Sequence, residues 1–249
     1  MANWNDPQPR QTGFGASPSL NGEAIGRATY DMGLRRHMLS IYNYMASGVL
    51  LSGIIALLFA QSGFAAQIML GGNPLAWLII LSPLAFVFAM SFGANRFSTP
   101  TLQAMFWGFA AVMGLSLSTI FLVYTKSSIA MTFFSTAAAF AGLSLFGYTT
   151  KKDLSGMGTF LIMGVVGLLV AMIINMFVGS TALQFAISAI GVLIFAGLTA
   201  YDTQRLKMMY YQVAGTEFAG KAVVLGALSL YLDFINMFQF LLAFMGQRD

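Results

Sequence analysis

Long apolar blocks without charged residues alternate with short polar connections along this chain. No Asp, Glu, Lys or Arg occurs in 37–95, 97–125, 127–150 or 154–201, and 222–246 carries a single carboxylate. A helix needs about 20 consecutive apolar residues to cross a bilayer core roughly 30 Å thick. The pattern therefore predicts membrane-spanning helices, because a transmembrane β-barrel would show segments of about ten residues with alternating polarity.

Two of these blocks are long enough for two helices each, because turn-forming residues divide them. The first block is interrupted at 61–63 and again at 71–74, and the block 154–201 is interrupted at 179–181. Seven spans are therefore expected, at about 38–60, 75–93, 101–124, 129–148, 157–178, 182–201 and 222–246.

The composition supports this prediction. Charged residues are 8% of the 249 residues and the AVILMFWYC set is 58%, whereas soluble domains are about a quarter charged. The chain has no Cys, which excludes disulfide bonds and thiolate metal sites. The expected fold class is an all-α integral membrane protein, with the lipid bilayer as its first partner.

Basic residues are concentrated on alternate connections, which predicts the orientation of the chain. Short loops rich in Lys and Arg stay on the cytoplasmic side of a membrane. With the N-terminus inside, only Lys126 and Arg248 of the 12 basic residues fall outside. Seven spans then place the C-terminus outside, but a re-entrant hairpin at 222–246 would return it inside, and the two alternatives stay open. Cations scattered over several loops also argue against a nucleic-acid partner, which needs one cationic face.

The first 36 residues differ in composition from the rest of the chain. They are rich in Pro, Gly, Ser and Asn and lack the apolar region of a cleavable signal peptide. We expect a flexible cytoplasmic N-terminal tail over 1–36 and a transmembrane domain over 37–249.

One carboxylate, Asp233, lies in the middle of a predicted span. An ionisable group there costs several kcal/mol unless it is protonated, partnered or hydrated, so it is a functional-site hypothesis by default. Ser229, Asp233 and Asn236 are spaced by four and three residues and form one polar stripe on the helix. The alternative is a hydrogen-bonded Asp that only fixes helix packing.

A second carboxylate, Asp202, lies at the inner end of the sixth predicted span. An Asp at a helix end is usually a solvated loop residue, and only pairing with Asp233 would change this interpretation. The other acidic residues lie in the tail, in loops or at the C-terminus. Asp202 and Asp233 are therefore the two candidates for chemistry inside the membrane. The polar stretch 212–221 between them predicts a long inner loop.

Three sequence segments carry a family resemblance. The run ALSLYLDFIN at 227–236, YDTQ at 201–204 and KKDLS at 151–155 resemble the transmembrane BAX inhibitor motif family (Bax inhibitor-1-like proteins) in its bacterial branch. The resemblance covers about 30–246. It implies a seven-helix bundle with a central C-terminal helix in the bacterial inner membrane, and a calcium leak whose opening depends on pH.

The resemblance also implies roles for individual residues. The paired aspartates of the family fall on Asp202 and Asp233, and the arginine that latches them falls on Arg96. Two carboxylates in a poorly hydrated site cannot both ionise cheaply, so we hypothesise that one shared proton holds them together and keeps the inner side closed. With Asn236 and Ser229 they would bind Ca²⁺ weakly, as a permeating ion requires. No resident cofactor is expected.

Other functions fit some of these features. A non-conducting partner or regulator of a membrane quality-control protease would use the 36-residue tail as the segment that the protease binds. A proton-coupled transporter also needs intramembrane carboxylates, although an odd number of spans without a visible inverted repeat disfavours it. An enzyme is not expected, because no His-Glu metal motif, nucleophile elbow or phosphate loop occurs, and neither Asp202 nor Asp233 has the neighbouring Gly of an intramembrane aspartyl protease.

Overall fold

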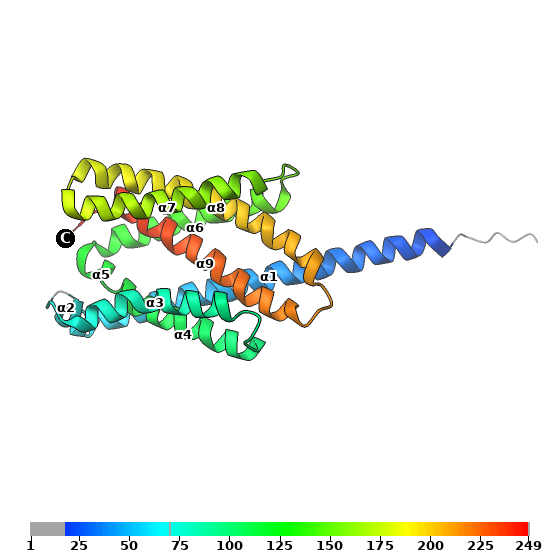
Figure 1. The fold of residues 1–249 in the computed structure, drawn as a ribbon, viewed down its shortest axis with the longest axis horizontal. Helices are drawn as coiled ribbons and strands as arrows, with labels where there is room; N and C mark the ends of the chain where they lie inside the picture. Colours follow the sequence, from blue (N-terminus) through cyan, green and yellow to red (C-terminus); the bar gives the residue numbers. More distant parts are fainter. Residues whose placement is uncertain (1–17, 70, 249) are drawn as a thin grey trace, which may run out of the picture. The chain divides into compact units, whose positions relative to one another are not determined.

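The computed structural model describes the backbone of residues 18–69 and 71–248 and the side chains from residue 32 onward within those ranges. Over these residues the structure is helical and contains no strand longer than one isolated bridge, between Tyr124 and Arg248. The helices in chain order are α1 (Pro18–Gln61), α2 (Phe64–Met69), α3 (Pro74–Gly93), α4 (Thr99–Leu117), α5 (Ile120–Val123), α6 (Lys126–Thr149), α7 (Ser155–Val178), α8 (Thr181–Val213) and α9 (Phe218–Met245) (Figure 1).

Seven segments of the described chain are long and apolar enough to cross a membrane, which confirms the expected number. They are Met32–Gln61, Pro74–Gly93, Thr99–Val123, Lys126–Thr149, Ser155–Val178, Thr181–Val213 and Phe218–Met245. Capping side chains fix several of the starts, since Asn73, Ser98, Thr125 and Ser180 each accept a hydrogen bond from a backbone N–H in the first turn of the following helix.

The sixth span is longer than the sequence predicts. Helix α8 continues beyond residue 201 to Val213, so the connection to α9 contains only residues 214–217. The long inner loop predicted over 212–221 is therefore wrong. The additional turns of α8 have a buried side and an exposed side. Leu206 is buried, whereas Met208 and Tyr211 are exposed. Gly215 closes the connection with a φ of 78°, a conformation that favours glycine.

The chain divides into two units between Arg36 and His37. Residues 1–17 of the predicted flexible tail lie outside the described residues. Residues 18–36 are helical as part of α1, whereas the sequence predicts a flexible segment. This stretch contains Glu, Ala, Arg, Leu and Met, which favour helix, and these outweigh its glycines.

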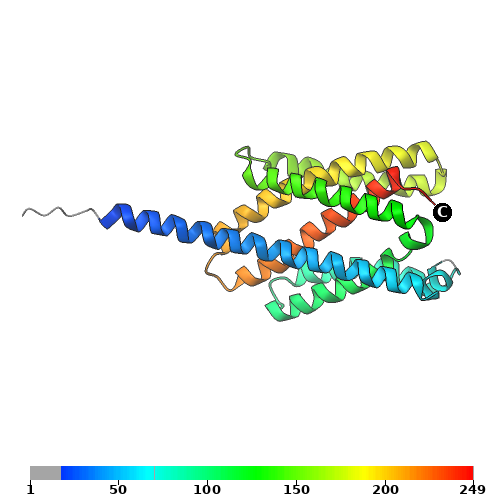
Figure 2. The same cartoon turned by 180° about the vertical axis from the view of Figure 1, so that it is seen from behind.

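Helix α9 is the central helix of the unit His37–Asp249, as the resemblance implies. It packs against α3, α4, α6 and α8, and more than half of its span is buried, the largest share among the seven spans. Figures 1 and 2 show α9 crossing between the group α6, α7 and α8 and the group α3 and α4. Polar residues of α9 are therefore held away from lipid.

A buried hydrogen-bond cluster fixes α9 in this central position. The Ser52 hydroxyl lies 2.6 Å from the Tyr231 hydroxyl and donates to the Ala110 carbonyl at 2.6 Å. The Tyr231 ring meets Phe109 edge to face, with 5.0 Å between centroids. Because these groups come from α1, α4 and α9, two polar contacts and one aromatic contact join three helices in an otherwise apolar interior.

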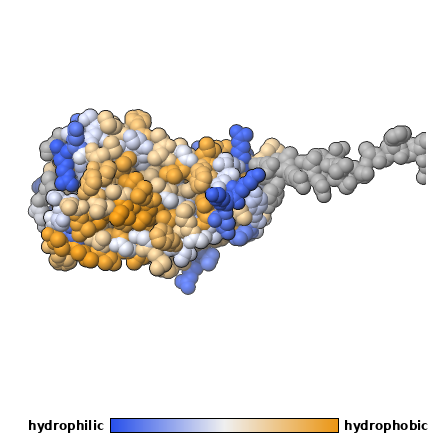
Figure 3. Space-filling view, turned by 90° about the horizontal axis from the view of Figure 1, so that it is seen from above, coloured by the Kyte–Doolittle hydropathy of each residue, from blue (hydrophilic) through white to orange (hydrophobic). Residues whose placement is uncertain are grey.

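The outer surface of the bundle is apolar. Large side chains such as Phe92, Phe177 and Trp77 are more than 60% exposed. Figure 3 shows hydrophobic residues over the middle of the visible face and hydrophilic residues toward its ends. Exposed apolar area of this extent fits lipid rather than water.

Candidate functional site

The site lies where α8 and α9 pack together. A Cβ atom at Gly226 would stand 2.8 Å from a methyl carbon of Leu206 on α8, so the absence of a side chain at Gly226 allows the two helices to approach closely. Ser229 follows Gly226 by three residues and therefore lies near the same face of α9. The sequence thus places a polar group of α9, the Ser229 hydroxyl, against α8 beside this close approach.

Asp202 is buried on the α8 side of this contact. The residue is 7% exposed, and its carboxylate oxygen Oδ2 accepts a hydrogen bond from the Ser229 hydroxyl. Its other oxygen, Oδ1, lies 3.7 Å from the Arg205 guanidinium, whose side chain is 55% exposed. Asp202 is therefore a buried and partnered carboxylate and not a solvated residue at a helix end.

Asp233 lies one helical turn beyond Ser229 and is 4% exposed. Its Oδ2 atom accepts no hydrogen bond from the described residues. A buried oxygen without a donor is costly when the carboxylate is ionised.

A cavity of about 320 Å³ reaches this site between α3, α8 and α9. Its polar lining consists of Ser91, Asp202, Arg205 and Ser229, and the remaining lining is apolar except for backbone atoms. Asp233 is not among the lining residues. The cavity therefore exposes one carboxylate of the pair and leaves the other enclosed.

Arg96 lies elsewhere. It is exposed in the connection between α3 and α4, and no described contact joins it to Asp202 or Asp233. The cation that pairs with Asp202 is Arg205, which sequence analysis missed. Its three-residue spacing from Asp202 is a helical ion-pair spacing, but the signal was hidden because the sixth helix was expected to end at residue 201.

Asn236 differs from the other members of the predicted polar stripe. Its side-chain amide donates to the Leu232 carbonyl of its own helix at 2.8 Å, so its N–H is used within α9. Of the predicted site residues, the structure therefore joins Asp202 to Ser229 and places Asp233 one turn further along α9, and it leaves Arg96 and Asn236 outside this contact.

The donor set suits weak cation binding. One carboxylate and one hydroxyl, those of Asp202 and Ser229, are in contact here, and the described part of the chain contains no group of three or more His, Cys, Asp or Glu side chains that could hold a metal ion. Ca²⁺ takes six to eight oxygen ligands. A Ca²⁺ ion at this site would therefore keep much of its hydration or use backbone carbonyls.

Comparisons with known proteins agree with the fold. The family model described as "Inhibitor of apoptosis-promoting Bax1" matches residues 34–249. An uncharacterized protein of Caulobacter vibrioides is 48% identical over 229 residues, which cover 87% of this chain and 90% of that protein. The "Inner membrane protein YbhL" of Escherichia coli K12 is 42% identical over 218 residues, which cover 87% of this chain and 93% of that protein. The similarity thus extends over nearly the whole transmembrane unit.

Proposed function

Because the chain belongs to the Bax inhibitor-1-like family of membrane proteins, we propose that it is a calcium leak whose opening depends on pH through Asp202 and Asp233. The observation that carries this proposal is the buried contact of Asp202 with Ser229, one turn from Asp233 on the central helix. Ionisable residues within membrane-spanning helices are typical of ion and proton pathways.

In the proposed mechanism a proton acts as the closing ligand. One proton shared by Asp202 and Asp233 removes the repulsion that two ionised carboxylates would exert in a poorly hydrated site. In this proposal the protonated pair holds α8 against α9, and the hydrogen bond from Ser229 to Asp202 supports the closed arrangement. Loss of this proton leaves two negative charges that repel each other, which favours separation of the helices on the inner side.

Arg205 takes the role of counter-charge that the resemblance gave to Arg96. Its guanidinium lies 3.7 Å from Asp202 and also lines the cavity that reaches the pair. Because the Arg205 side chain is half exposed, its guanidinium can turn toward solvent without unfolding α8. The ion pair of Asp202 and Arg205 is therefore the contact that a Ca²⁺ ion would have to replace.

The cavity between α3, α8 and α9 is the proposed route of Ca²⁺ to the pair. It ends at Asp202 and Ser229 and does not include Asp233, which suits a closed conformation. Because the pair offers few protein ligands, the ion is bound weakly, and weak binding lets it leave again. In this proposal the protein resides in the bacterial inner membrane with its N-terminus in the cytoplasm.

Ca²⁺ flux into liposomes that contain the purified protein tests this function. Wild-type flux is expected to rise as pH rises, because the proton that closes the pair is lost. Asp202→Asn and Asp233→Asn should each lower the flux about tenfold and flatten its pH dependence, since one charge of the site is lost and the other carboxylate no longer titrates against it.

Glu217→Gln is the matched control, because Glu217 is exposed at the start of α9 and contacts neither aspartate. It removes the same charge and should leave flux unchanged. If both aspartate variants kept the wild-type flux and pH dependence, the two-carboxylate gate would be wrong. If they were also silent in cells while deletion of 1–30 abolished the cellular effect, a non-conducting partner of a membrane protease would be the better explanation.

A further inference from the structure

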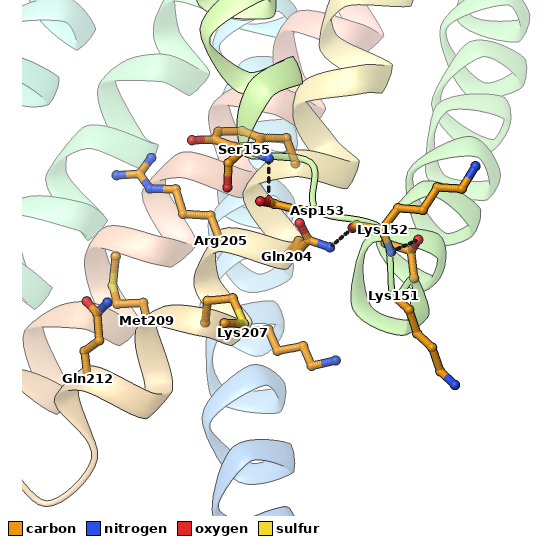
Figure 4. A pocket seen from close by; sticks show the side chains of 12 residues that line it. Lys151, Lys152, Asp153, Ser155, Gln204, Arg205, Lys207, Met209 and Gln212 are labelled. Atoms are coloured by element: carbon orange, nitrogen blue, oxygen red, sulfur yellow. Dashed lines mark hydrogen bonds between the residues drawn. The ribbon is translucent and has the colours of Figure 1, made fainter.

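We propose that the cavity beside the α6–α7 connection binds the phosphate headgroup of an anionic phospholipid. This cavity measures about 670 Å³, within the range of about 300–1,000 Å³ usual for small-molecule sites. It lies between residues 150–155 and the inner half of α8, and Figure 4 shows the side chains that line it. The proposed calcium leak makes no use of this cavity.

Positive charge predominates around the cavity. Lys151, Lys152, Arg205 and Lys207 line it, against one carboxylate, Asp153. Clusters of Lys and Arg at the cytoplasmic ends of membrane helices attract anionic lipid headgroups. The lining therefore carries an excess of three positive charges, which favours a phosphate over a zwitterionic or neutral group.

The single carboxylate is already engaged. Asp153 accepts a hydrogen bond of 2.9 Å from the Ser155 backbone N–H at the start of α7. Hydrogen bonds from the side chain and the backbone of Ser155 lower the pKa of Asp153. Asp153 thus stays ionised and bound to the helix start at neutral pH, while the lysines beside it keep their charge available.

The cations differ in how they are held. The Lys207 ammonium donates to the Tyr148 carbonyl at 2.8 Å and lies over the Tyr148 ring, and Arg205 pairs with Asp202. The side chains of Lys151 and Lys152 extend from the connection in Figure 4, and no ion pair holds either of them among the described residues. These two lysines are therefore the cations that can close on a bound headgroup.

The connection that carries these lysines is fixed to α8. The Gln204 side chain accepts a hydrogen bond from the Leu154 N–H at 2.8 Å and donates one to the Lys152 carbonyl at 2.8 Å. Both bonds come from one amide group, so they hold the connection in one position against the helix; Figure 4 shows the bond to Lys152. A preformed wall of this kind lowers the ordering cost of binding.

Apolar surface next to the cavity favours a lipid over a soluble phosphate compound. Met208 lines the cavity and is 56% exposed, and Phe160, which is 73% exposed, follows the lining residue Ser155 by five positions on α7. The cavity lies at the start of the span Ser155–Val178. A phospholipid therefore places its phosphate among the lysines while its acyl chains cover the exposed side chains of α7.

Native mass spectrometry of the purified full chain in detergent tests this proposal, with phosphatidylglycerol and phosphatidylcholine as probes. The wild type is expected to retain phosphatidylglycerol at least about tenfold more tightly than phosphatidylcholine. Lys151→Gln with Lys152→Gln should remove about tenfold of this affinity, since each lysine near a membrane surface contributes an appreciable share. Arg205 is left intact because it pairs with Asp202.

Two further double variants serve as controls. Lys151→Arg with Lys152→Arg keeps both charges and should retain the lipid, which separates loss of charge from loss of folding. Arg96→Gln with Lys126→Gln removes two charges that lie outside the cavity and should also bind like the wild type.

Three outcomes would overturn the proposal. The first is equal retention of the two lipids by the wild type. The second is an equal loss in the Gln variant of the cavity and in the control at Arg96 and Lys126, which would indicate general charge attraction. The third is displacement of phosphatidylglycerol by equimolar glycerol 3-phosphate, which would identify the ligand as a free phosphate compound rather than a lipid.

Discussion

At the scale of single residues, the chemistry of the site depends on which polar groups share one buried contact. Asp233 was recognisable from the sequence because no other charge lies within its span. The sequence did not show whether Asp202 is buried or solvated. The hydrogen bond from Ser229 shows that it is bound to α9 rather than being a solvated residue at a helix end. Arg205 was missed, because its importance comes from lying beside a carboxylate whose own burial was unknown.

Exchange of this arginine gives a prediction at the same scale. Arg205→Gln removes the positive charge 3.7 Å from Asp202, which favours the protonated and closed pair. The pH at which Ca²⁺ flux begins is expected to move upward by about 0.5 unit, a small shift because the half-exposed cation is screened by solvent. Flux in liposomes over a pH series measures it.

Arg96→Gln is the matched control, since it removes the same charge from an exposed position outside the site. Its flux curve should coincide with that of the wild type. A shift in Arg96→Gln together with an unchanged curve in Arg205→Gln would return the latch to Arg96.

At the scale of elements, helix identity was predictable and helix length was not. An apolar block of about 20 residues indicates a span because the bilayer excludes unpaired backbone groups. A helix that continues beyond the membrane loses this signal, since its outer turns become polar. For this reason α8 was expected to end at 201, whereas it reaches Val213, and its polar turns were assigned to a loop.

Close packing of helices makes a second prediction. A Cβ atom at Gly147 of α6 would stand 2.2 Å from the Ala200 carbonyl oxygen of α8, and backbone cannot move aside as a flexible side chain can. Gly147→Ala is therefore expected to destabilise the bundle by about 1–3 kcal/mol. Unfolding in detergent, followed by circular dichroism, measures the loss.

Gly142→Ala on the same helix is its control. No atom lies within 4 Å of a Cβ atom placed there, so this substitution should be neutral or stabilise α6 by about 0.5–1 kcal/mol. If the two variants unfolded at the same midpoint, the close approach of α6 and α8 at Gly147 would be refuted.

At the scale of the whole molecule, the distribution of charge predicts how the chain lies in the membrane. The native chain has no Cys, so single cysteines at 126, 152 and 248 can be labelled without interference. In intact spheroplasts a membrane-impermeant maleimide is expected to reach 126 and 248, and to reach 152 only after permeabilisation. The physical reason is the retention of basic loops on the cytoplasmic side.

Each labelling result distinguishes one alternative. Labelling of 152 but not 126 in intact spheroplasts would reverse the orientation. Labelling of 126 but not 248 would indicate that the last apolar block is re-entrant, which would return the C-terminus to the inside. Hydrogen bonds of Thr125 and Ser128 with Gln247 hold the C-terminal residues beside the start of α6, which favours the same side for 126 and 248.

The sequence by itself determined the seven spans, the membrane-embedded class and the intramembrane carboxylate at Asp233. These are local properties, because each helix in lipid satisfies its own backbone hydrogen bonds and carries its own apolar length. The tertiary structure decided that Arg205 rather than Arg96 pairs with Asp202, that Asn236 bonds to its own helix, and that cavities lie beside α8. Those features depend on side chains that packing alone brings together from distant parts of the chain.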